Sequence, residues 1–331
     1  MKILVTGHAG FIGFHLARRL LADGHEVVGY DGFTDYYDVR LKQARQGMLT
    51  GSPGFRGVVG MLEDAGLLSD TIAETAPDAV VHLAAQAGVR YSLEHPETYV
   101  SSNLVGTFNL LEALRATPVR HAILASTSSI YGANDGPGFA ETERTDFPLS
   151  IYAATKRGTE ALAHSYAHLF AIPTTLARFF TVYGPWGRPD MAPLKFATAI
   201  SRGTPIEVYG HGRQSRDFTY IDDVVEALVR LIAAPPDTGH PVSAADSLSP
   251  VAPWRTVNIA GGQPVPLMEF IAAFETALGK PALKTLLPMQ PGDVAATRAD
   301  TTLLRDLIGY APQTSVTDGV KAFVDWFKTQ T

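Results

Sequence analysis

Residues 3–13 read ILVTGHAGFIG, in which an apolar β pattern passes through three glycines into a helical pattern. Gly7, Gly10 and Gly13 leave the backbone bare at this turn, and the N-terminus of a helix follows. Such a turn suits a pyrophosphate, because the backbone can approach closely and the helix dipole favours negative charge. The spacing alone is weak evidence, since a turn needed only for packing looks the same. It predicts a dinucleotide site if it is the first βα turn of an α/β fold.

The chain that follows alternates β and α patterns. Strands are expected at 2–6, 26–30, 79–83, 121–126 and 174–180. Helical patterns such as 14–23 and 101–116 separate these runs. The rhythm predicts the α/β class, with a doubly wound parallel (Rossmann) sheet.

After residue 180 the alternation loosens, and proline and glycine become more frequent. We therefore expect a dinucleotide-binding Rossmann domain over 1–180 and a smaller C-terminal α/β lobe for the substrate over 181–331. Segments 214–233 and 256–261 still show regular patterns, so they are expected to return to the first domain. The two parts would then be interleaved along the chain.

Composition restricts the classes of function. The 331 residues carry a formal charge of -6, so no basic excess indicates a nucleic-acid partner. No cysteine is present, which excludes disulfides and thiolate metal sites, and we predict no metal site. The chain begins MKILVTG without a leader pattern, and it has no run of about 18 apolar residues. We expect a cytoplasmic protein without a membrane partner.

Asp31 ends the second expected strand, where a carboxylate can accept hydrogen bonds from both hydroxyls of an adenosine ribose. The same charge would repel a 2'-phosphate, and no Arg or Lys follows it before Arg40. Asp31 therefore favours NAD over NADP.

Tyr152 and Lys156 open a helical pattern at positions i and i+4, so their side chains share one face. A nearby ammonium favours the phenolate, which lets a tyrosine with a reference pKa of about 10 act as acid or base near neutral pH. The hydroxyl run 126–129 ends a buried strand and can contribute donors. Alone the pair arises often by chance, but behind a dinucleotide turn it indicates a catalytic pair.

Arg188 lies in the segment 178–191, RFFTVYGPWGRPDM, within a loop that Pro185, Trp186 and Pro189 stiffen. A guanidinium in a rigid loop is a good bidentate partner for a carboxylate. The alternatives are that Arg188 binds a diphosphate or is a surface arginine.

The motifs TGHAGFIG, HLAAQAGVR, NLVGT, STSSIYG, YAATK, RDFTYIDDVV and PGDV follow in an order that resembles the extended short-chain dehydrogenase/reductase family. Within it, the chain is most similar to nucleotide-sugar 4-epimerases that act on UDP-glucuronate. The resemblance implies that Tyr152 is the base, that Lys156 is its electrostatic partner and anchors the nicotinamide ribose, and that Thr127 supplies a hydroxyl. Asn103 resembles a position that supports the active site, or is a packing amide. The resemblance also implies a homodimer through 109–116 and 156–170.

The resemblance implies two further sets of contacts. Besides the glycines, Asp31, Tyr152 and Lys156, the NAD site would contain Phe11, Ile12, Leu62, Leu83, Ala84 and Ala85. The UDP-sugar would contact Gly88, Val89, Arg90, Ser128, Ser129, Thr181, Arg188, Lys195, Phe196, Val208, Arg216 and Asp293.

Ser128 and Ser129 distinguish between sister reactions. Related dehydratases and decarboxylases place a carboxylate just after the triad hydroxyl to move a second proton, whereas epimerisation needs only the tyrosine. We therefore expect epimerisation at carbon 4 of UDP-glucuronate through a 4-keto sugar, with Arg188 restraining the carboxylate. The alternatives are a 4-epimerase of neutral UDP-sugars (UDP-glucose or UDP-N-acetylglucosamine) and a non-catalytic NAD-binding sensor.

Overall fold

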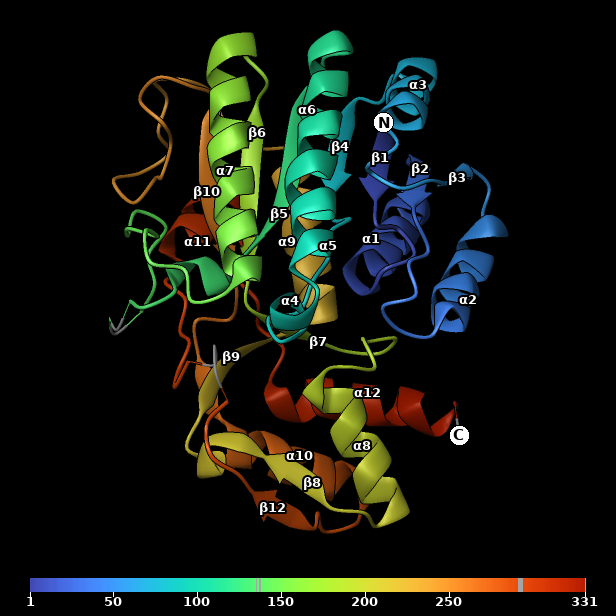
Figure 1. Ribbon diagram of the computed structural model, residues 1–331, viewed down its shortest axis with the longest axis vertical. Coiled ribbons are helices and arrows are strands. Elements are labelled where there is room, and N and C mark those ends of the chain that lie inside the picture. Colours follow the sequence, from blue (N-terminus) through green and yellow to red (C-terminus); the bar gives the residue numbers. More distant parts are fainter. Residues whose placement is uncertain (135, 137, 291–293, 331) are drawn as a thin grey trace.

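A parallel sheet of seven strands forms the centre of the computed structural model, which describes residues 1–134, 136, 138–290 and 294–330 (Figure 1). The strand order is β10-β6-β5-β4-β1-β2-β3, and each neighbouring pair is parallel. The strands are β1 (Lys2–Thr6), β2 (Glu26–Asp31), β3 (Phe55–Val59), β4 (Ala79–His82), β5 (His121–Thr127), β6 (Thr174–Phe179) and β10 (Trp254–Ile259). The order reverses between β1 and β4, which is where doubly wound sheets bind ligands. The predicted fold class is confirmed.

The inner strands are apolar and buried on both faces, as parallel strands between two helical layers must be. Ile3, Val5 and Val27 face the layer of α1 and α9, while Leu4 and Val28 face the layer of α3, α6 and α7. The sequence reasoning missed β3, because this edge strand is half-exposed and contains Arg56 and Gly57.

The helices cover both faces of the sheet. Those of the Rossmann part are α1 (Phe11–Ala22), α2 (Val39–Thr50), α3 (Ala65–Thr75), α4 (Tyr91–Glu94), α5 (Pro96–Tyr99), the π-helix η1 (Val100–Val105), α6 (Gly106–Ala116), the 3₁₀-helix η2 (Ser128–Tyr131), α7 (Ile151–Phe170), α9 (Ile221–Ile232) and α11 (Thr302–Ile308). Figure 1 shows α6 and α7 side by side on one face of the sheet. In the described part of the chain, no helix has the length and apolar character to cross a membrane.

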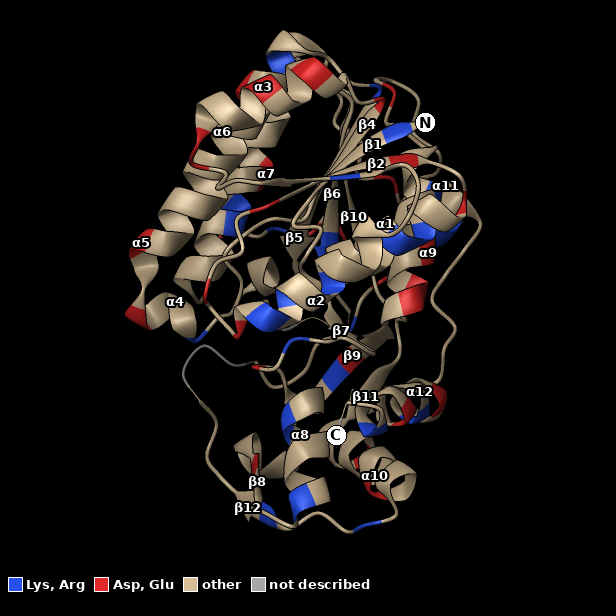
Figure 2. Ribbon diagram, turned by 90° about the vertical axis from the view of Figure 1, so that its right-hand side faces the viewer, with Lys and Arg blue, Asp and Glu red and all other residues tan. Residues whose placement is uncertain are grey.

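A smaller part lies beyond the carboxyl ends of the strands (Figures 1 and 2). It contains β7 (Thr181–Tyr183), α8 (Ala192–Arg202), β8 (Ile206–Val208), η3 (Tyr209–Gly212), β9 (Ser215–Tyr220), β11 (Pro264–Pro266), α10 (Leu267–Leu278), β12 (Lys284–Leu286) and α12 (Val316–Lys328). Phe218 and Phe270 stack at its centre, with ring centroids 3.8 Å apart. Acidic and basic residues are interspersed over both parts (Figure 2).

The two segments expected to return to the Rossmann part are α9 with the strand before it, and β10. Helix α9 packs against α1, and β10 pairs with β6 in the central sheet. The strand part of 214–233 was placed wrongly: β9 pairs with β7 and β11 in a separate three-stranded sheet. Since β10 already occupies the free edge of β6, β9 has no partner left in the central sheet.

Candidate active site

A cavity of about 290 Å³, called the first cavity below, lies at the carboxyl ends of the central strands. Its wall contains a residue that ends or directly follows each of β1 to β6: Gly7, Asp31, Gly60, Leu83, Thr127 and Phe179. Carboxyl ends of parallel strands meet at one edge of a sheet, and this cavity spans the point where the strand order reverses.

The glycine turn forms one wall of the first cavity and has no room for side chains. Gly7 has a φ of +74°, and a Cβ there would lie 2.7 Å from the backbone nitrogen of Ala84. A Cβ on Gly13 would lie 2.1 Å from the carbonyl oxygen of Gly7. The turn therefore needs glycine to let α1 begin against β1, and the free space above it fits a pyrophosphate.

Asp31 is buried beside this turn. Its carboxylate accepts hydrogen bonds from the backbone N–H groups of Ala9 at 3.1 Å and Phe33 at 2.8 Å. A carboxylate has about four acceptor positions, so two are left for ribose hydroxyls. The glycine cradle and this acidic group together fit NAD.

All residues predicted to bind the cofactor line the first cavity. They are Gly7, Gly10, Phe11, Ile12, Gly13, Asp31, Leu62, Leu83, Ala84, Ala85, Tyr152 and Lys156. Their roles in NAD binding stay predictions, but the tertiary structure brings the set together.

The three predicted catalytic residues also line this cavity. Thr127 is the last residue of β5, and Tyr152 lies in the first turn of α7. The hydroxyl of Ser150 caps that helix by accepting a hydrogen bond from the backbone N–H of Ala153 at 3.1 Å. The capping residue lies two residues before Tyr152, and α7 then places Tyr152 and Lys156 on the cavity side.

Burial shifts the pKa of both members of the pair. It raises the pKa of Tyr152, whereas a hydrogen bond with Thr127 and the charge of Arg188 act in the opposite direction. Burial lowers the pKa of Lys156 to about 8, against the effect of the Glu160 carboxylate. At neutral pH the phenol and the ammonium are therefore the main forms. The charge of Arg188 favours a lower pKa of Tyr152, and the electrostatic role expected of Lys156 stays a prediction.

A second cavity of about 160 Å³ contains five of the predicted substrate residues. They are Val89, Ser128, Ser129, Thr181 and Arg216, and Ser150 and Thr297 add two more hydroxyls. The two cavities are neighbours, because Thr127 lines the first and Ser128 the second. No carboxylate lines the second cavity among the described residues.

Arg188 lines the first cavity rather than the second. Its Nε and Nη2 atoms donate to the two carboxylate oxygens of Asp190 at 3.0 and 2.5 Å. The hydroxyl of Tyr36 donates to the same carboxylate at 3.0 Å. Burial disfavours the charged guanidinium, but Asp190 outweighs this and raises the pKa of Arg188. Arg188 is thus a charged group already held by an internal carboxylate.

Five other predicted substrate residues, Gly88, Arg90, Lys195, Phe196 and Val208, line neither cavity. Gly88 has a φ of +106° and lies against Tyr36, and the exposed Arg90 has its guanidinium 4.8 Å from the ring centre of Tyr209. Lys195 is exposed on α8, while Phe196 and Val208 pack in the hydrophobic core. Asp293 lies outside the described residues. The contacts of these residues with substrate stay predictions.

Sequence reasoning missed Arg45, which is fully buried. Its guanidinium donates to the carbonyl oxygens of Ala9 at 2.9 Å and Trp186 at 2.6 Å. Arg45 thereby ties the glycine turn to the loop that carries Arg188. A lone arginine in an amphipathic helix gives no sign of this in sequence.

Asn103 is buried in η1 and holds the cavity wall. Its amide group donates to the hydroxyl of Thr155 at 3.1 Å and the carbonyl of Gln86 at 3.1 Å, and it accepts from the N–H of Gln86 at 2.8 Å. These contacts join η1, α7 and the segment after β4. Among the described residues, this arrangement is compatible with both expectations for Asn103, which are a packing amide and a support of the site.

Known proteins were then compared with the chain. A model of the NAD dependent epimerase/dehydratase family matches residues 3–244. The chain belongs to this family. A probable UDP-glucuronate 4-epimerase of Rhizobium meliloti (strain 1021) is 57% identical over 331 residues, covering 99% of this chain and 97% of the relative. UDP-glucuronate 4-epimerase 1 of Arabidopsis thaliana is 42% identical over 99% of this chain and 76% of its own.

A solved structure agrees with this placement in the epimerase/dehydratase family. The UDP-glucuronic acid 4-epimerase of Bacillus cereus, in complex with UDP-glucuronic acid and NAD, matches with a TM-score of 0.89. It is 35% identical, and the match covers 100% of both chains. The family expected from the sequence motifs is confirmed.

The glycine turn gives the first testable prediction. Gly13→Ala should weaken NAD binding about tenfold or more, because its methyl group collides with the carbonyl of Gly7 and displaces α1. Gly47→Ala is the matched control, since a Cβ there meets nothing within 4 Å on the exposed side of α2. Calorimetric titration with NAD measures both variants. Parental affinity in Gly13→Ala would contradict this account of the turn.

Proposed function

We propose that this protein catalyses the NAD-dependent epimerisation of UDP-glucuronate to UDP-galacturonate at carbon 4. The observation that carries the proposal is the second cavity beside Tyr152. Its described lining offers hydroxyls and Arg216 but no carboxylate, which suits an anionic sugar nucleotide. Relatives over nearly the whole chain bear the name UDP-glucuronate 4-epimerase, and one was crystallised with UDP-glucuronic acid and NAD.

The missing acid also limits the chemistry. Elimination of water requires a group that moves a second proton near the sugar ring, and a dedicated decarboxylase would use such a group to protonate the enolate that loss of carbon dioxide leaves. Ser128 and Ser129 follow Thr127 at the positions where such a group would lie, and neither titrates near neutral pH. Epimerisation needs one proton carrier, and Tyr152 is that carrier.

The reaction uses the residues of the first cavity in turn. Bound NAD supplies hydride chemistry at carbon 4 of the sugar. The phenolate form of Tyr152 accepts the proton of the 4-hydroxyl as hydride leaves carbon 4, which yields a 4-keto sugar. The sugar then presents its other face, hydride returns, and Tyr152 gives the proton back. Lys156 and Arg188 provide positive charge that favours the phenolate during the first half.

A substrate panel tests the proposal. The protein should convert UDP-glucuronate to UDP-galacturonate, with much slower conversion of UDP-glucose and UDP-N-acetylglucosamine, as read by chromatography. Tyr152→Phe should lower the rate by about 10²- to 10⁴-fold, because the proton carrier is lost. Faster turnover of a neutral sugar would instead support the neutral 4-epimerase. NAD binding without turnover of any sugar would support the sensor.

Arg188 has a second task in this proposal. The 4-keto intermediate is a β-keto acid, which loses carbon dioxide when its carboxylate bond stands perpendicular to the carbonyl plane. A guanidinium that holds the carboxylate near that plane suppresses this loss. To do so, Arg188 must share its donors between the sugar and Asp190, which it already binds through two hydrogen bonds.

Arg188→Ala should therefore raise the KM for UDP-glucuronate by about 10- to 100-fold and release a UDP-4-keto-pentose, detected by mass spectrometry. Binding of UDP alone separates the two possible anions: its affinity should stay parental if Arg188 holds the carboxylate, and should fall if Arg188 holds the diphosphate. Product without keto-pentose, at parental KM, would refute the role.

We also propose that the protein forms a homodimer through α6 and α7, which lie side by side (Figure 1). Exposed apolar side chains occur on these helices and directly before α6: Val105 and Phe108 are 44% and 45% exposed, and Leu169 at the end of α7 is 67% exposed. A second copy that presents the same helices would cover these side chains. A cytoplasmic location fits a UDP-sugar substrate and is part of this proposal.

Phe108→Glu tests the interface, because a charge at its centre opposes burial. Light scattering after gel filtration should give the mass of a dimer for the parent and of a monomer for this variant. Leu286→Glu, at a comparably exposed apolar position on β12, should leave the dimer intact. A monomeric parent would exclude the interface.

A further inference from the structure

Helix α7 carries a third polar residue on the face that holds the catalytic pair. Tyr152, Lys156 and Glu160 follow one another at intervals of four, so they lie along one stripe of the helix. Tyr152 and Lys156 line the first cavity, while Glu160 lies one turn further along α7, and its side chain is fully buried.

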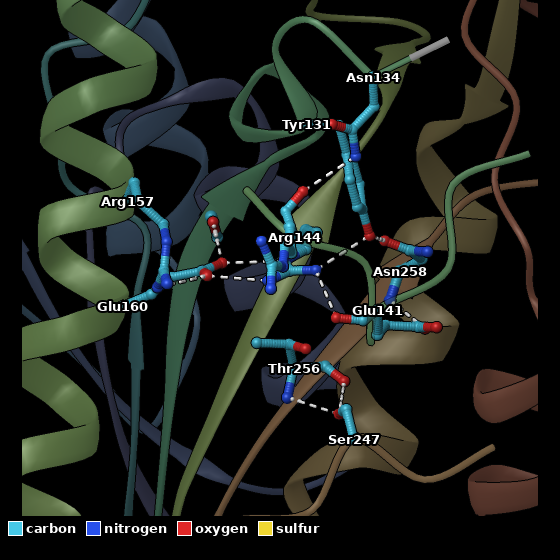
Figure 3. Close-up of polar contacts among 11 residues, drawn as sticks. Tyr131, Asn134, Glu141, Arg144, Arg157, Glu160, Ser247, Thr256 and Asn258 are labelled. Carbon is cyan, nitrogen blue, oxygen red and sulfur yellow. Dashed lines mark hydrogen bonds and ion pairs between the residues drawn. The ribbon is translucent and has the colours of Figure 1, made fainter. Parts of the chain in front are cut away.

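The Glu160 carboxylate is fixed from two strands. Arg178 on β6 donates from Nε to one oxygen at 3.0 Å and from Nη2 to the other at 2.9 Å. Ser126 on β5 donates its hydroxyl proton to Glu160 at 2.7 Å. Arg157 approaches from the other side at 3.8 Å, and Figure 3 shows it next to Glu160. The carboxylate is therefore shielded from water and cannot rotate, so its negative charge is neither screened nor displaced.

Ser126 connects this cluster to the reaction site, because it also lines the first cavity next to Thr127. Its proton is committed to Glu160, so toward the cavity the hydroxyl oxygen can only accept hydrogen bonds. The hydroxyl oxygen of Ser126 thus presents a hydrogen-bond acceptor to an ammonium or amide donor in the first cavity.

The remaining charged and titratable groups near Lys156 leave Glu160 as the anion that acts on it. On β4, burial lowers the pKa of His82 to about 3, so this ring is neutral at physiological pH. Arg178 on β6 is paired with Glu160 and Arg188 with Asp190, and Tyr99 on α5 is held protonated because burial raises its pKa. Burial lowers the pKa of Lys156, and Glu160 alone opposes this.

We propose that Glu160 is a positioning residue for the catalytic pair. Arg178 holds its carboxylate in place, one helical turn from Lys156, so that Glu160 supplies a fixed negative charge next to Lys156. Glu160 also orients the hydroxyl of Ser126 at the wall of the first cavity. The importance of Glu160 for catalysis rests on the proposed function, whereas its electrostatic effect on Lys156 does not. If Glu160 and Arg178 served only the fold, their charges would add little to stability, because buried ion pairs can often be replaced by apolar groups without loss of stability.

The far side of the same network supplies a matched control. Arg178 also donates to the hydroxyl of Tyr131 at 3.0 Å, and that hydroxyl donates to Asn258 at 2.7 Å. Figure 3 shows Tyr131 and Asn258 meeting beyond Glu141, away from α7. Tyr131→Phe therefore disturbs the network without changing any charge near Lys156.

The experiment is a direct titration of Lys156 by NMR, with ¹³C-labelled lysine in the full-length protein. The chain contains eight lysines, so the Lys156 signal can be assigned from its loss in Lys156→Met. Glu160→Gln should move the titration of Lys156 to lower pH by about one unit, the effect expected of one charge across a helical turn. The alkaline limb of kcat for UDP-glucuronate should move the same way. Tyr131→Phe should leave both unchanged.

Glu160→Gln leaves Arg178 buried without its partner, which can prevent folding. The double variant Glu160→Gln/Arg178→Met removes both charges, and it should show a smaller shift in the same direction. An unshifted Lys156 in either folded variant would overturn the proposal. Failure of both to fold would overturn it too, because the pair would then serve the fold. The NMR titration needs no turnover, so it stands even if the substrate assignment fails.

Discussion

Helix α1 can begin directly against β1 only because Gly13 has no side chain. A Cβ there would lie 2.1 Å from the carbonyl oxygen of Gly7, so any other residue would push the helix away from the sheet. The open N-terminus of α1 depends on this contact, whereas the segment after β4 can pass close because Gly7 lacks a Cβ, which would lie 2.7 Å from the backbone nitrogen of Ala84. Helix α9 packs on α1, and Arg45 ties the same turn to the loop before α8. The bare turn therefore determines the shape of the first cavity and the position of the Arg188 loop.

Helix α7 is the second rigid element of the site. The Ser150 cap fixes where it begins, and that start determines which residues face the cavities. Ser150 itself lines the second cavity, and Tyr152 and Lys156 line the first. One turn further, Glu160 joins α7 to β5 and β6 through Ser126 and Arg178. A single helix thus spaces a hydroxyl of the second cavity, the Tyr152–Lys156 pair of the first cavity and the buried charge of Glu160.

Charged side chains in this site form ion pairs with one another. Arg188 pairs with Asp190 and Arg178 with Glu160, so these two cations each have an anion before any ligand arrives. Pairing makes burial of these charges possible, because an isolated ion would be too costly to desolvate. If Arg188 binds the substrate carboxylate as we propose, that carboxylate must compete with Asp190 for its donors.

Local patterns in the sequence were sufficient to predict the parallel sheet, the glycine turn, and the positions of Asp31 and of the Tyr152–Lys156 pair in the site. Each depends on residues a few positions apart, and helix or strand geometry alone determines how such residues face one another. The edge strand β3 and the pairing of β9 with β7 were not predictable in this way, because a strand's partner depends on which sheet edge is still free. Tertiary structure alone decided that Arg188 meets Tyr36, that Phe196 turns into the core, and that Glu160 meets Arg178 and Ser126. These contacts join segments far apart in the chain, and their free energy comes from packing and desolvation that no short stretch of sequence contains.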